Sequence, residues 1–290
     1  MVRGVWFWVL GWLLTVLTVL GNGLLIYLIT STKRLHNTVN WFLLSLALAD
    51  LGVGCSYFPT VTICKWSPSL CNKCITTALQ WLFLNLSMTN LCALSIDRCI
   101  AIAMPFKYSV FKAKKRHRFL LAAAWILPFV FHFAPFTPMY CAGMKNAVRH
   151  FLTVTLFIFK LPSFLLLLTT CLKTLYTAHK QKKQASVRLS QLKFNGFAPG
   201  DIKTLRLPTQ ASTFAKALGI IVTIFLICYA IEIARLICYT IHCTKHIPWV
   251  LVQVQYLLFI CNSASNPLVY AFLKQDIGQE VKRLMKCLGS

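Results

Sequence analysis

The sequence predicts an all-α protein in which seven helices cross a membrane as one bundle. Three observations support this fold class. The 290 residues are 58% hydrophobic and only 12% charged, the mean hydropathy is +0.67, and seven apolar runs are separated by polar segments. A soluble domain usually carries about 25% charged residues, so a chain this apolar has too little polar surface to cover itself in water. Lipid is therefore the expected solvent.

Each apolar run reaches the roughly 20 residues that a helix needs to cross the hydrocarbon core. The first run follows Arg3 and could be a signal peptide, but it continues beyond the about 7–15 apolar residues of such a segment and holds Asn22 at mid-depth, so we predict a true span. The predicted spans, which make residues 1–273 one domain, are Val5–Thr30, Val39–Ile63, Ile75–Met104, Phe119–Phe136, Phe151–Leu175, Thr213–Ile241 and Pro248–Leu273.

Two segments outside the spans have distinctive sequence patterns. Residues 274–290 place Ile277, Val281 and Leu284 near helical spacing with basic residues opposite, which predicts a short amphipathic helix on the membrane surface. Cys287 near its end is a candidate for palmitoylation, with an unmodified thiol as the alternative. The loop of about residues 178–212 is polar, basic and glycine-containing, and it predicts a flexible cytoplasmic linker.

Charge predicts the orientation. The sequence has 30 Lys and Arg residues and only six Asp and Glu residues, which gives a net charge of +24. Nucleic-acid binding would need these cations on a soluble face, whereas here they lie between apolar runs, so we expect contact with membrane lipids and no nucleic acid. By the positive-inside rule the richer side is cytoplasmic, the N-terminus is extracellular and the C-terminus cytoplasmic in the plasma membrane. That side holds Lys33, Arg34, Lys107, Lys112, Lys114, Lys115, Arg116, Arg118, Lys180, Lys182, Lys183, Arg188, Lys193, Lys203 and Arg206, against Arg3, Lys65, Lys73, Lys145, Arg149 and Lys245.

Acidic residues are rare enough to be informative. Asp50, Asp97 and Glu232 fall within spans, where an ionisable group is costly and a functional candidate. The other three, Asp201, Asp276 and Glu280, are predicted to be cytoplasmic. Acids so few and so deep argue against hydrolytic chemistry, so no enzyme activity is expected. The lone Cys71/Cys74 CxxC pair is a weak metal signal.

A series of short motifs appears in order along the spans. They are Gly21-Asn22, Leu46-Ala47-Leu48-Ala49-Asp50, Asp97-Arg98-Cys99 followed by Pro105 and Tyr108, Trp125, Pro162, Asn262-Ser263 and Asn266-Pro267-Leu268-Val269-Tyr270. Together they resemble the rhodopsin-like (class A) G-protein-coupled receptor family over nearly the whole chain. The resemblance implies a receptor that binds an extracellular ligand in the outer half of the bundle and activates a heterotrimeric G protein, with arrestin as a further partner.

The resemblance also assigns roles to particular residues. It implies a packed relay below the ligand and a set of switch and G-protein-coupling residues near the cytoplasmic end. It further implies a sodium ion at the bundle centre, for which a polar network holding only water is the alternative. The relay residues are Met88, Pro162 and Phe225; the switch residues are Asp97, Arg98, Phe106, Asn266, Pro267 and Tyr270; the sodium residues are Asp50, Ser87, Asn262, Ser263 and Asn266, with Asn22 nearby.

Some positions depart from the family pattern. No acid stands at the inner end of the sixth span to lock Arg98, which predicts basal signalling. Thr170 stands where a Tyr partner of Tyr270 is usual. In the sixth span Tyr229 replaces the usual Trp and Ile231 the usual kink-forming Pro, so a straighter helix is expected. A signalling-deficient or ligand-independent receptor-like protein is therefore the main alternative. A transporter would need repeated halves or broken helices, which the sequence does not show.

The outer third of the bundle should hold a small ligand. Gln80 stands where amine receptors carry Asp, and Ile260 where visual pigments carry the retinal-linking Lys, so no retinal and no resident cofactor is expected. Lys160 and Glu232 would be near enough to pair with each other, as a structural ion pair or as ligand contacts. Further candidate lining residues are Trp81, Tyr229, Arg235 and His132.

The cysteines outside the spans suggest disulfides. Cys141, in the predicted loop Thr137–Arg149, resembles the family's loop cysteine, whose partner lies at the top of the third span. We expect that partner to be Cys74, with Cys71 as the alternative. A second bridge could form among Cys64, Cys71 and Cys243.

Overall fold

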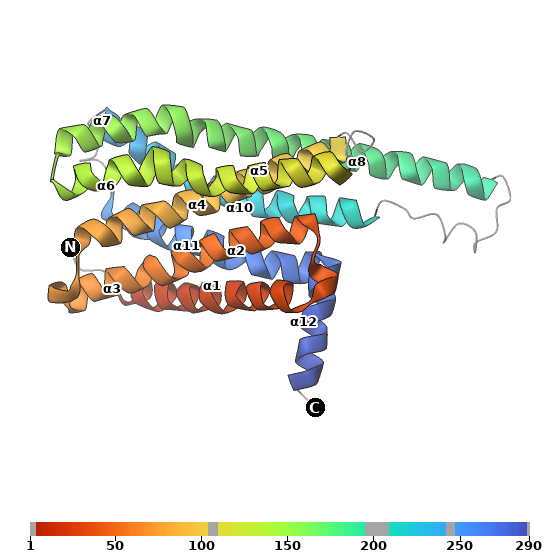
Figure 1. The fold of residues 1–290 in the computed structure, drawn as a ribbon, viewed down its shortest axis with the longest axis horizontal. Coiled ribbons are helices and arrows are strands. Elements are labelled where there is room, and N and C mark those ends of the chain that lie inside the picture. The colour runs from red at the N-terminus through yellow and green to blue at the C-terminus, as the bar shows by residue number, and fades with distance from the viewer. Residues whose placement is uncertain (1–3, 104–109, 195–208, 242–246, 289–290) are drawn as a thin grey trace.

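The computed structural model describes residues 4–103, 110–194, 209–241 and 247–288. Within these ranges the protein is helical, and seven helical segments are long and apolar enough to cross a membrane, which confirms the predicted fold class. The segments run side by side along the long axis of the molecule, and the last helix turns away from them (Figure 1).

The spans are built as follows. The first, third, sixth and seventh are single helices, whereas the second is a pair and the fourth and fifth each contain a π-helical turn. In chain order they are α1 (Val5–Ser31); α2 (Thr38–Ser56) with α3 (Phe58–Trp66); α4 (Lys73–Ala103); α5 (Val110–Pro128), η4 (Phe129–Phe133) and α6 (Ala134–Cys141); α7 (Lys145–Thr155), η5 (Leu156–Lys160) and α8 (Leu161–Phe194); α10 (Thr209–Thr240); and α11 (Trp249–Leu273), followed by α12 (Gln275–Leu288).

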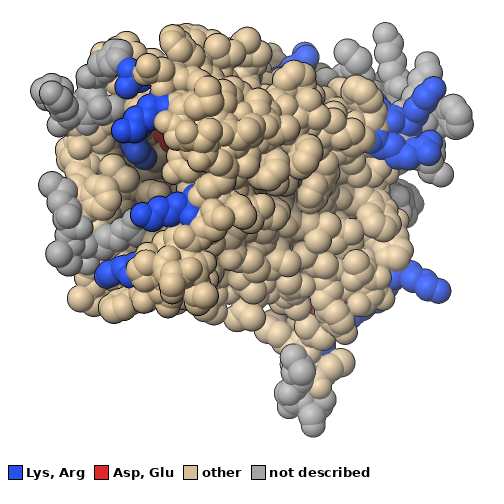
Figure 2. Space-filling view, turned by 60° about the vertical axis from the view of Figure 1, so that its left-hand side comes forward, with Lys and Arg blue, Asp and Glu red and all other residues tan. Residues whose placement is uncertain are grey.

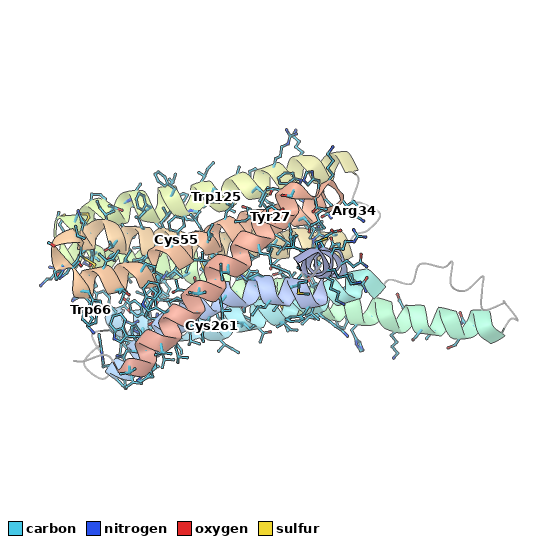
Figure 3. All side chains as sticks on the ribbon, turned by 90° about the horizontal axis from the view of Figure 1, so that it is seen from below. Tyr27, Arg34, Cys55, Trp66, Trp125 and Cys261 are labelled. Atoms are coloured by element: carbon cyan, nitrogen blue, oxygen red, sulfur yellow. A yellow bond between two sulfur atoms is a disulfide. The ribbon has the colours of Figure 1, made fainter. Side chains whose placement is uncertain are left out.

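Helix α4 occupies the middle of the bundle. It packs against α2, α5 and α8, while α1 packs against α2 and α11, and α10 lies between α8 and α11. We call the end that carries the Cys64–Cys71 and Cys74–Cys141 disulfides the disulfide end, and the opposite end the α12 end. Figure 3 shows Trp66 near the first and Arg34 near the second.

Two predicted loops are shorter than expected. The loop predicted for Thr137–Arg149 is a tight turn between α6 and α7, in which Gly143 adopts φ = 67°, a value that glycine accepts without strain. The linker predicted from residue 178 is helical as far as Phe194. Extending an existing helix costs far less than nucleating one, and this segment is rich in helix-forming Lys, Gln, Ala and Leu. Polarity alone was therefore a poor guide to where α8 ends.

The two π-helical turns coincide with prolines. Because a proline has no backbone N–H, Pro135 cannot donate to the carbonyl of Phe131, nor Pro162 to that of Ile158. Each of these carbonyls lies in a π turn, closed by the backbone N–H of Ala134 to Phe129 and of Leu161 to Leu156. The same turns contain His132 and Lys160, both buried. The π turns were not predicted from the sequence. In contrast α10, where Ile231 replaces the usual Pro, is one continuous α-helix.

An apolar belt surrounds the bundle. Large hydrophobic side chains are exposed along its sides, and on the face in Figure 2 the Lys and Arg side chains gather at the two ends with little charge between them. A water-soluble protein rarely exposes so continuous an apolar surface, which agrees with a surface covered by lipid. Examples are Leu13, Leu20, Phe131, Ile158 and Phe272.

Glycine at position 11 allows α1 to approach α3. A Cβ atom there would lie 2.0 Å from Cε2 of Phe58. That ring is fully buried and packs against Phe7, Trp8 and Trp12 at centroid distances of 5.4, 5.6 and 5.7 Å, so it has little room to move.

We therefore expect Gly11→Ala to destabilise the protein by about 1–3 kcal/mol through overpacking, measured as a lower melting temperature of the purified protein in lipid nanodiscs. The matched control is Gly23→Ala in the same helix, whose added methyl would meet nothing within 4 Å. Equal melting temperatures for the two variants would contradict this account of the α1–α3 contact.

Candidate functional site

The centre of the bundle holds a buried carboxylate. Asp50 of α2 is fully buried, and three side chains from two other helices donate to it. The hydroxyls of Ser87 and Ser263 both lie 2.7 Å from its Oδ1 atom, and Nδ2 of Asn266 lies 2.6 Å from Oδ2. The carboxylate therefore joins α2, α4 and α11. A buried charge is tolerated only with such hydrogen bonds.

Unpaired oxygens lie around this carboxylate. The Oδ1 atoms of Asn22, Asn262 and Asn266 are buried and lack a hydrogen-bond partner among the described residues, and Nδ2 of Asn22 donates to the Ser263 carbonyl at 3.1 Å. Carboxylate and amide oxygens are suitable ligands for a small hard cation. Of the five predicted sodium residues, the structure joins Asp50, Ser87, Ser263 and Asn266 by hydrogen bonds, whereas the side chain of Asn262 makes none with Asp50.

At the α12 end of α4 a second buried carboxylate pairs with two arginines. Arg98 contacts Oδ2 of Asp97, and Arg116 of α5 lies 2.9 Å from Oδ1. The side chain of Asp97 is fully buried, and those of Arg98 and Arg116 are 13% and 22% exposed. Arg116 was missed as a site residue, although it belongs to a basic run at the start of the fourth span. Phe106, the other predicted coupling residue of this region, lies outside the described residues.

The seventh span passes close to the first. A Cβ atom on Gly21 would lie 2.7 Å from Cγ of Pro267, so glycine lets α1 approach α11 there. Tyr270 is fully buried, and its hydroxyl has no hydrogen-bond partner among the described residues. Thr170 donates instead to the Leu166 carbonyl of its own helix at 2.7 Å. The structure therefore has no Tyr270–Thr170 hydrogen bond.

The predicted relay is only partly assembled. Met88 and Phe225 are buried, but Pro162 is exposed on the outside of the fifth span, so the expected buried trio is wrong at that position. Phe225 stacks instead on Tyr229, with ring centroids 4.0 Å apart. Tyr229 is itself buried and donates its hydroxyl to the Leu84 carbonyl at 3.1 Å.

Another motif residue belongs to a hydrogen-bond chain across three spans. Trp125 of α5 donates its indole N–H to the Ser45 hydroxyl at 2.8 Å, and Ser45 donates to Oδ1 of Asn90 at 2.6 Å. This chain links α5, α2 and α4.

Towards the disulfide end, the two predicted intramembrane charges form an ion pair. Nζ of Lys160 lies 2.9 Å from Oε1 of Glu232, and Nε2 of Gln255 donates to Oε2. Lys160 and Glu232 are only 2% and 5% exposed, and the ammonium also lies 4.3 Å from the centroid of the Trp81 ring. The structure therefore has the ion-pair arrangement. Gln255 was missed, although an amide within the seventh span was a visible signal.

A cavity of about 570 Å³ opens nearer the disulfide end, between α3, α4, α6 and α11. This volume is within the range of small-molecule sites. Of the predicted ligand residues Gln80 lines this cavity, whereas Trp81, Lys160, Tyr229, Glu232 and Arg235 do not. Gln80 donates to the Tyr57 carbonyl at 3.2 Å and to the Thr60 hydroxyl. The lining residues are Thr60, Val61, Cys64, Lys65, Lys73, Thr76, Thr77, Gln80, Tyr140, Trp249 and Tyr256.

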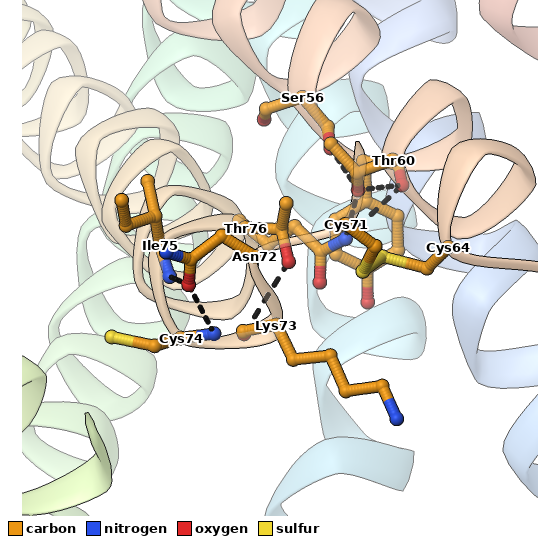
Figure 4. Close-up of a disulfide and its surroundings, with 11 residues drawn as sticks. Ser56, Thr60, Cys64, Cys71, Asn72, Lys73, Cys74, Ile75 and Thr76 are labelled. Carbon is orange, nitrogen blue, oxygen red and sulfur yellow. Dashed lines mark hydrogen bonds between the residues drawn. A yellow bond between two sulfur atoms is a disulfide. The ribbon is translucent and has the colours of Figure 1, made fainter. Parts of the chain in front are cut away.

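Disulfides fix the segments around this cavity. Cys74 is bonded to Cys141, with Cα atoms 5.1 Å apart. Cys64 is bonded to Cys71, with Cα atoms 4.8 Å apart (Figure 4). Cys71 is thus the partner of Cys64 and not of Cys141. Cys243 lies outside the described residues, and Cys238, which the sequence analysis did not consider, is also disulfide-bonded.

Helix α12 is tied to the bundle by polar contacts. Nζ of Lys274 lies 2.6 Å from Oδ1 of Asp276. Nδ2 of Asn40 on α2 donates to Oδ2 of the same carboxylate at 3.4 Å. Burial lowers the pKa of the Lys274 ammonium. Burial alone would raise the pKa of the Asp276 carboxyl, but the hydrogen bond and charge of Lys274 lower it below its usual value. Cys287, near the end of α12, is exposed.

Comparison with known proteins agrees with these features. The profile of the family "7 transmembrane receptor (rhodopsin family)" matches residues 21–270, so the chain belongs to that family. It is a multi-pass membrane receptor, and its relatives are receptors rather than enzymes.

The relatives differ in the ligand that they are named for. The adenosine receptors A2a of Canis lupus familiaris and Homo sapiens are each 27% identical over 299 residues, covering 94% of this chain and 70% of the relative. The octopamine receptor beta-2R of Chilo suppressalis is 23% identical over 314 residues, covering 95% of this chain and 78% of the relative. Identities this low to receptors of different names do not assign a ligand.

Proposed function

We propose that this receptor binds a small extracellular ligand at the disulfide end and activates a heterotrimeric G protein at the α12 end, with arrestin as a further partner. The observation that carries the proposal is the buried Asp97 with its two arginines. An ion pair at membrane depth is costly to keep, and an arginine that can exchange one partner for another suits a switch. The Asp50 network lies between this pair and the cavity, where a movement of α10 and α11 would be transmitted.

Orientation follows from the distribution of charge. The described cations of the α12 end include Lys33, Arg34, Lys180 and Lys216, and the disulfide end has Lys65, Lys73, Lys145 and Arg149. The long loops of the α12 end add further Lys and Arg in the sequence. By the positive-inside rule we place the α12 end in the cytoplasm and the N-terminus outside the plasma membrane. Disulfides also form in the oxidising extracellular environment, which agrees with this orientation.

The first test compares the unmutated chain with Arg98→Ala in a cell-based G-protein dissociation assay without added ligand. An N-terminal epitope tag, stained on intact cells, matches surface expression and tests the orientation. We expect a basal signal that Arg98→Ala abolishes, because Arg98 is restrained at rest by Asp97, with no further acid at the inner end of the sixth span in the sequence. A tag detectable only after permeabilisation would refute the orientation. A basal signal that survives Arg98→Ala would refute the role given to Arg98.

We also propose that the Asp50 site holds a sodium ion in the resting receptor. The three unpaired amide oxygens beside the carboxylate support this, because water or a cation would have to satisfy them. Sodium chloride should raise the melting temperature of the purified receptor more than choline chloride at equal ionic strength, and Asp50→Asn should remove the difference. Equal effects of the two salts on the unmutated receptor would favour a network that holds only water.

Palmitoylation of Cys287 is proposed on its position. It is exposed near the end of an amphipathic helix, where an acyl chain could enter the adjacent bilayer. Metabolic labelling with a palmitate analogue should mark the unmutated receptor and not Cys287→Ser. Equal labelling of both would exclude this site.

A signalling-deficient receptor is the second candidate, because the continuous α10 and the buried Tyr229 depart from the family pattern.

The names of the relatives suggest a nucleoside or an amine as the ligand. An amine has little support here, because Glu232 is the only acid among the described residues of the disulfide half of the spans, and Lys160 already neutralises it.

A further inference from the structure

The buried ion pair of Lys160 and Glu232 offers no free charge to a ligand. The carboxylate of Glu232 is engaged on one oxygen by Lys160 and on the other by Gln255, so a ligand that bound there would first have to separate a buried ion pair. The cavity between α3, α4, α6 and α11 needs no such separation. It is the better candidate for the ligand proposed above.

Charge in this cavity has one sign. Lys65 and Lys73 line it, and no acid of the described residues does. Asp50 and Glu232 are held by the side chains described above, Asp97 pairs with arginines at the opposite end, Asp276 and Glu280 are on α12, and Asp201 falls between α8 and α10 in the chain. Among the residues that the structure describes, the two lysines therefore have no carboxylate partner.

The fold keeps these two cations together. Lys65 directly follows Cys64, and Lys73 comes two residues after Cys71, so the Cys64–Cys71 disulfide joins the two lysine-bearing segments (Figure 4). The ammonium of Lys65 lies over two neutral rings, 4.3 Å from the centroid of Trp8 and 4.7 Å from that of Trp66. Such contacts position a cation and leave its charge in place. Two like charges on a covalently closed rim are a preorganised arrangement for an anion.

A third donor comes from α11. The indole N–H of Trp249 is buried and has no hydrogen-bond partner among the described residues, and Trp249 lines the same cavity. Indole nitrogen and lysine ammonium groups can only donate hydrogen bonds, so all three groups are suited to bind an acceptor. The remaining wall includes the rings of Tyr140 and Tyr256, suited to a flat apolar body.

We propose that the receptor's ligand is a small aromatic organic anion, whose carboxylate binds Lys65, Lys73 and the Trp249 N–H while its ring packs against Tyr140 and Tyr256. This inference rests on the proposed receptor function and specifies its ligand class. Aromatic carboxylates are preferred over their amides, and aromatic amines are excluded by repulsion from the two lysines.

The test uses the full-length receptor in nanodiscs and three sets of matched probes. Each set has a carboxylate, its amide and its amine: indole-3-acetate, indole-3-acetamide and tryptamine; phenylacetate, phenylacetamide and phenethylamine; benzoate, benzamide and benzylamine. Melting temperature is measured against probe concentration at constant ionic strength. We expect at least one carboxylate to stabilise the receptor with an apparent affinity about ten-fold above that of its amide, and no stabilisation by the amines.

Variants locate the site. Lys65→Gln and Lys73→Gln should each weaken the carboxylate by about ten-fold, since each removes a charged hydrogen bond. Lys145→Gln is the matched control, because Lys145 is a cation near the same end that does not line the cavity. Trp249→Phe tests the indole donor and should weaken the carboxylate more than its amide, because a hydrogen bond to a charged acceptor is the stronger of the two.

Three results would overturn the inference: no carboxylate of the panel stabilises the receptor, an amine or amide stabilises it as well as its carboxylate, or the carboxylate effect is unchanged in Lys65→Gln and Lys73→Gln. Non-specific attraction would show as an equal loss in Lys145→Gln. The basal assay with Arg98→Ala needs no ligand. An intact basal signal with no anion binding would therefore refute the ligand class alone, and a missing Arg98-dependent signal would count against the proposed function alone.

Discussion

Replacing Lys160 by Met is expected to destabilise the receptor by about 3–5 kcal/mol, the usual effect of removing one member of a buried ion pair. The variant leaves the Glu232 carboxylate within the membrane with only the Gln255 amide as a described partner. Water cannot compensate, because both pair members are almost completely buried. The measurement is the melting temperature in nanodiscs, together with the fraction of receptor that reaches the cell surface.

Two further variants separate the cost of an unpaired charge from the loss of packing. Lys160→Met combined with Glu232→Gln removes both charges and should recover most of the stability, since a neutral pair of similar volume is often as stable as a buried ion pair. Arg283→Gln removes one member of the exposed Arg283–Glu280 pair and should change stability by less than about 1 kcal/mol. If the double variant melts no higher than Lys160→Met, the charge is not what the single variant loses.

Asp97→Asn is expected to raise the basal G-protein signal by at least about five-fold, at the lower end of typical coupling energies. The fully buried Asp97 carboxylate holds Arg98 and, across the α4–α5 contact, Arg116. An asparagine amide cannot neutralise two guanidinium groups, so Arg98 would be released to the G protein more often. The G-protein dissociation assay at matched surface expression measures this change.

Arg116→Gln provides the companion variant. It removes the α5 member of the cluster and leaves the Asp97–Arg98 pair in place. The change in basal G-protein signal should therefore be smaller than that caused by Asp97→Asn. An unchanged or lower signal in Asp97→Asn, at normal surface expression, would show that Asp97 does not restrain Arg98 at rest.

The number and order of the spans could be predicted because they depend on local composition. A segment of about 20 apolar residues has few stable alternatives to a membrane-spanning helix, since its backbone hydrogen bonds must be satisfied within the segment. The intramembrane acids were also identifiable, because a carboxylate at that depth is costly wherever the helix points. Asp50, Asp97 and Glu232 are accordingly the centres of the three polar clusters, and the Lys160–Glu232 pair was among the expected contacts.

Other features depended on how each helix is rotated about its axis, which no local pattern specifies. Arg116 reaches Asp97, and Gln255 reaches Glu232, only because α5 and α11 present those faces to α4 and α10. The π turns before Ala134 and Leu161 add a residue to the helical turn and so shift which side chains face inward. The resemblance to the family therefore placed Pro162 in the packed interior, whereas the structure has it exposed.

The position of the cavity is the feature that depended most clearly on tertiary packing. A cavity is space that side chains from several helices leave unfilled, and this one is lined by residues of α3, α4, α6 and α11. Its position is therefore defined only when these helices are packed together. Composition and spacing determined which residues lie in the membrane and which carry charge. Packing determined which of them meet and where room remains, because helix rotation and side-chain rotamers are set by contacts between segments distant in the chain.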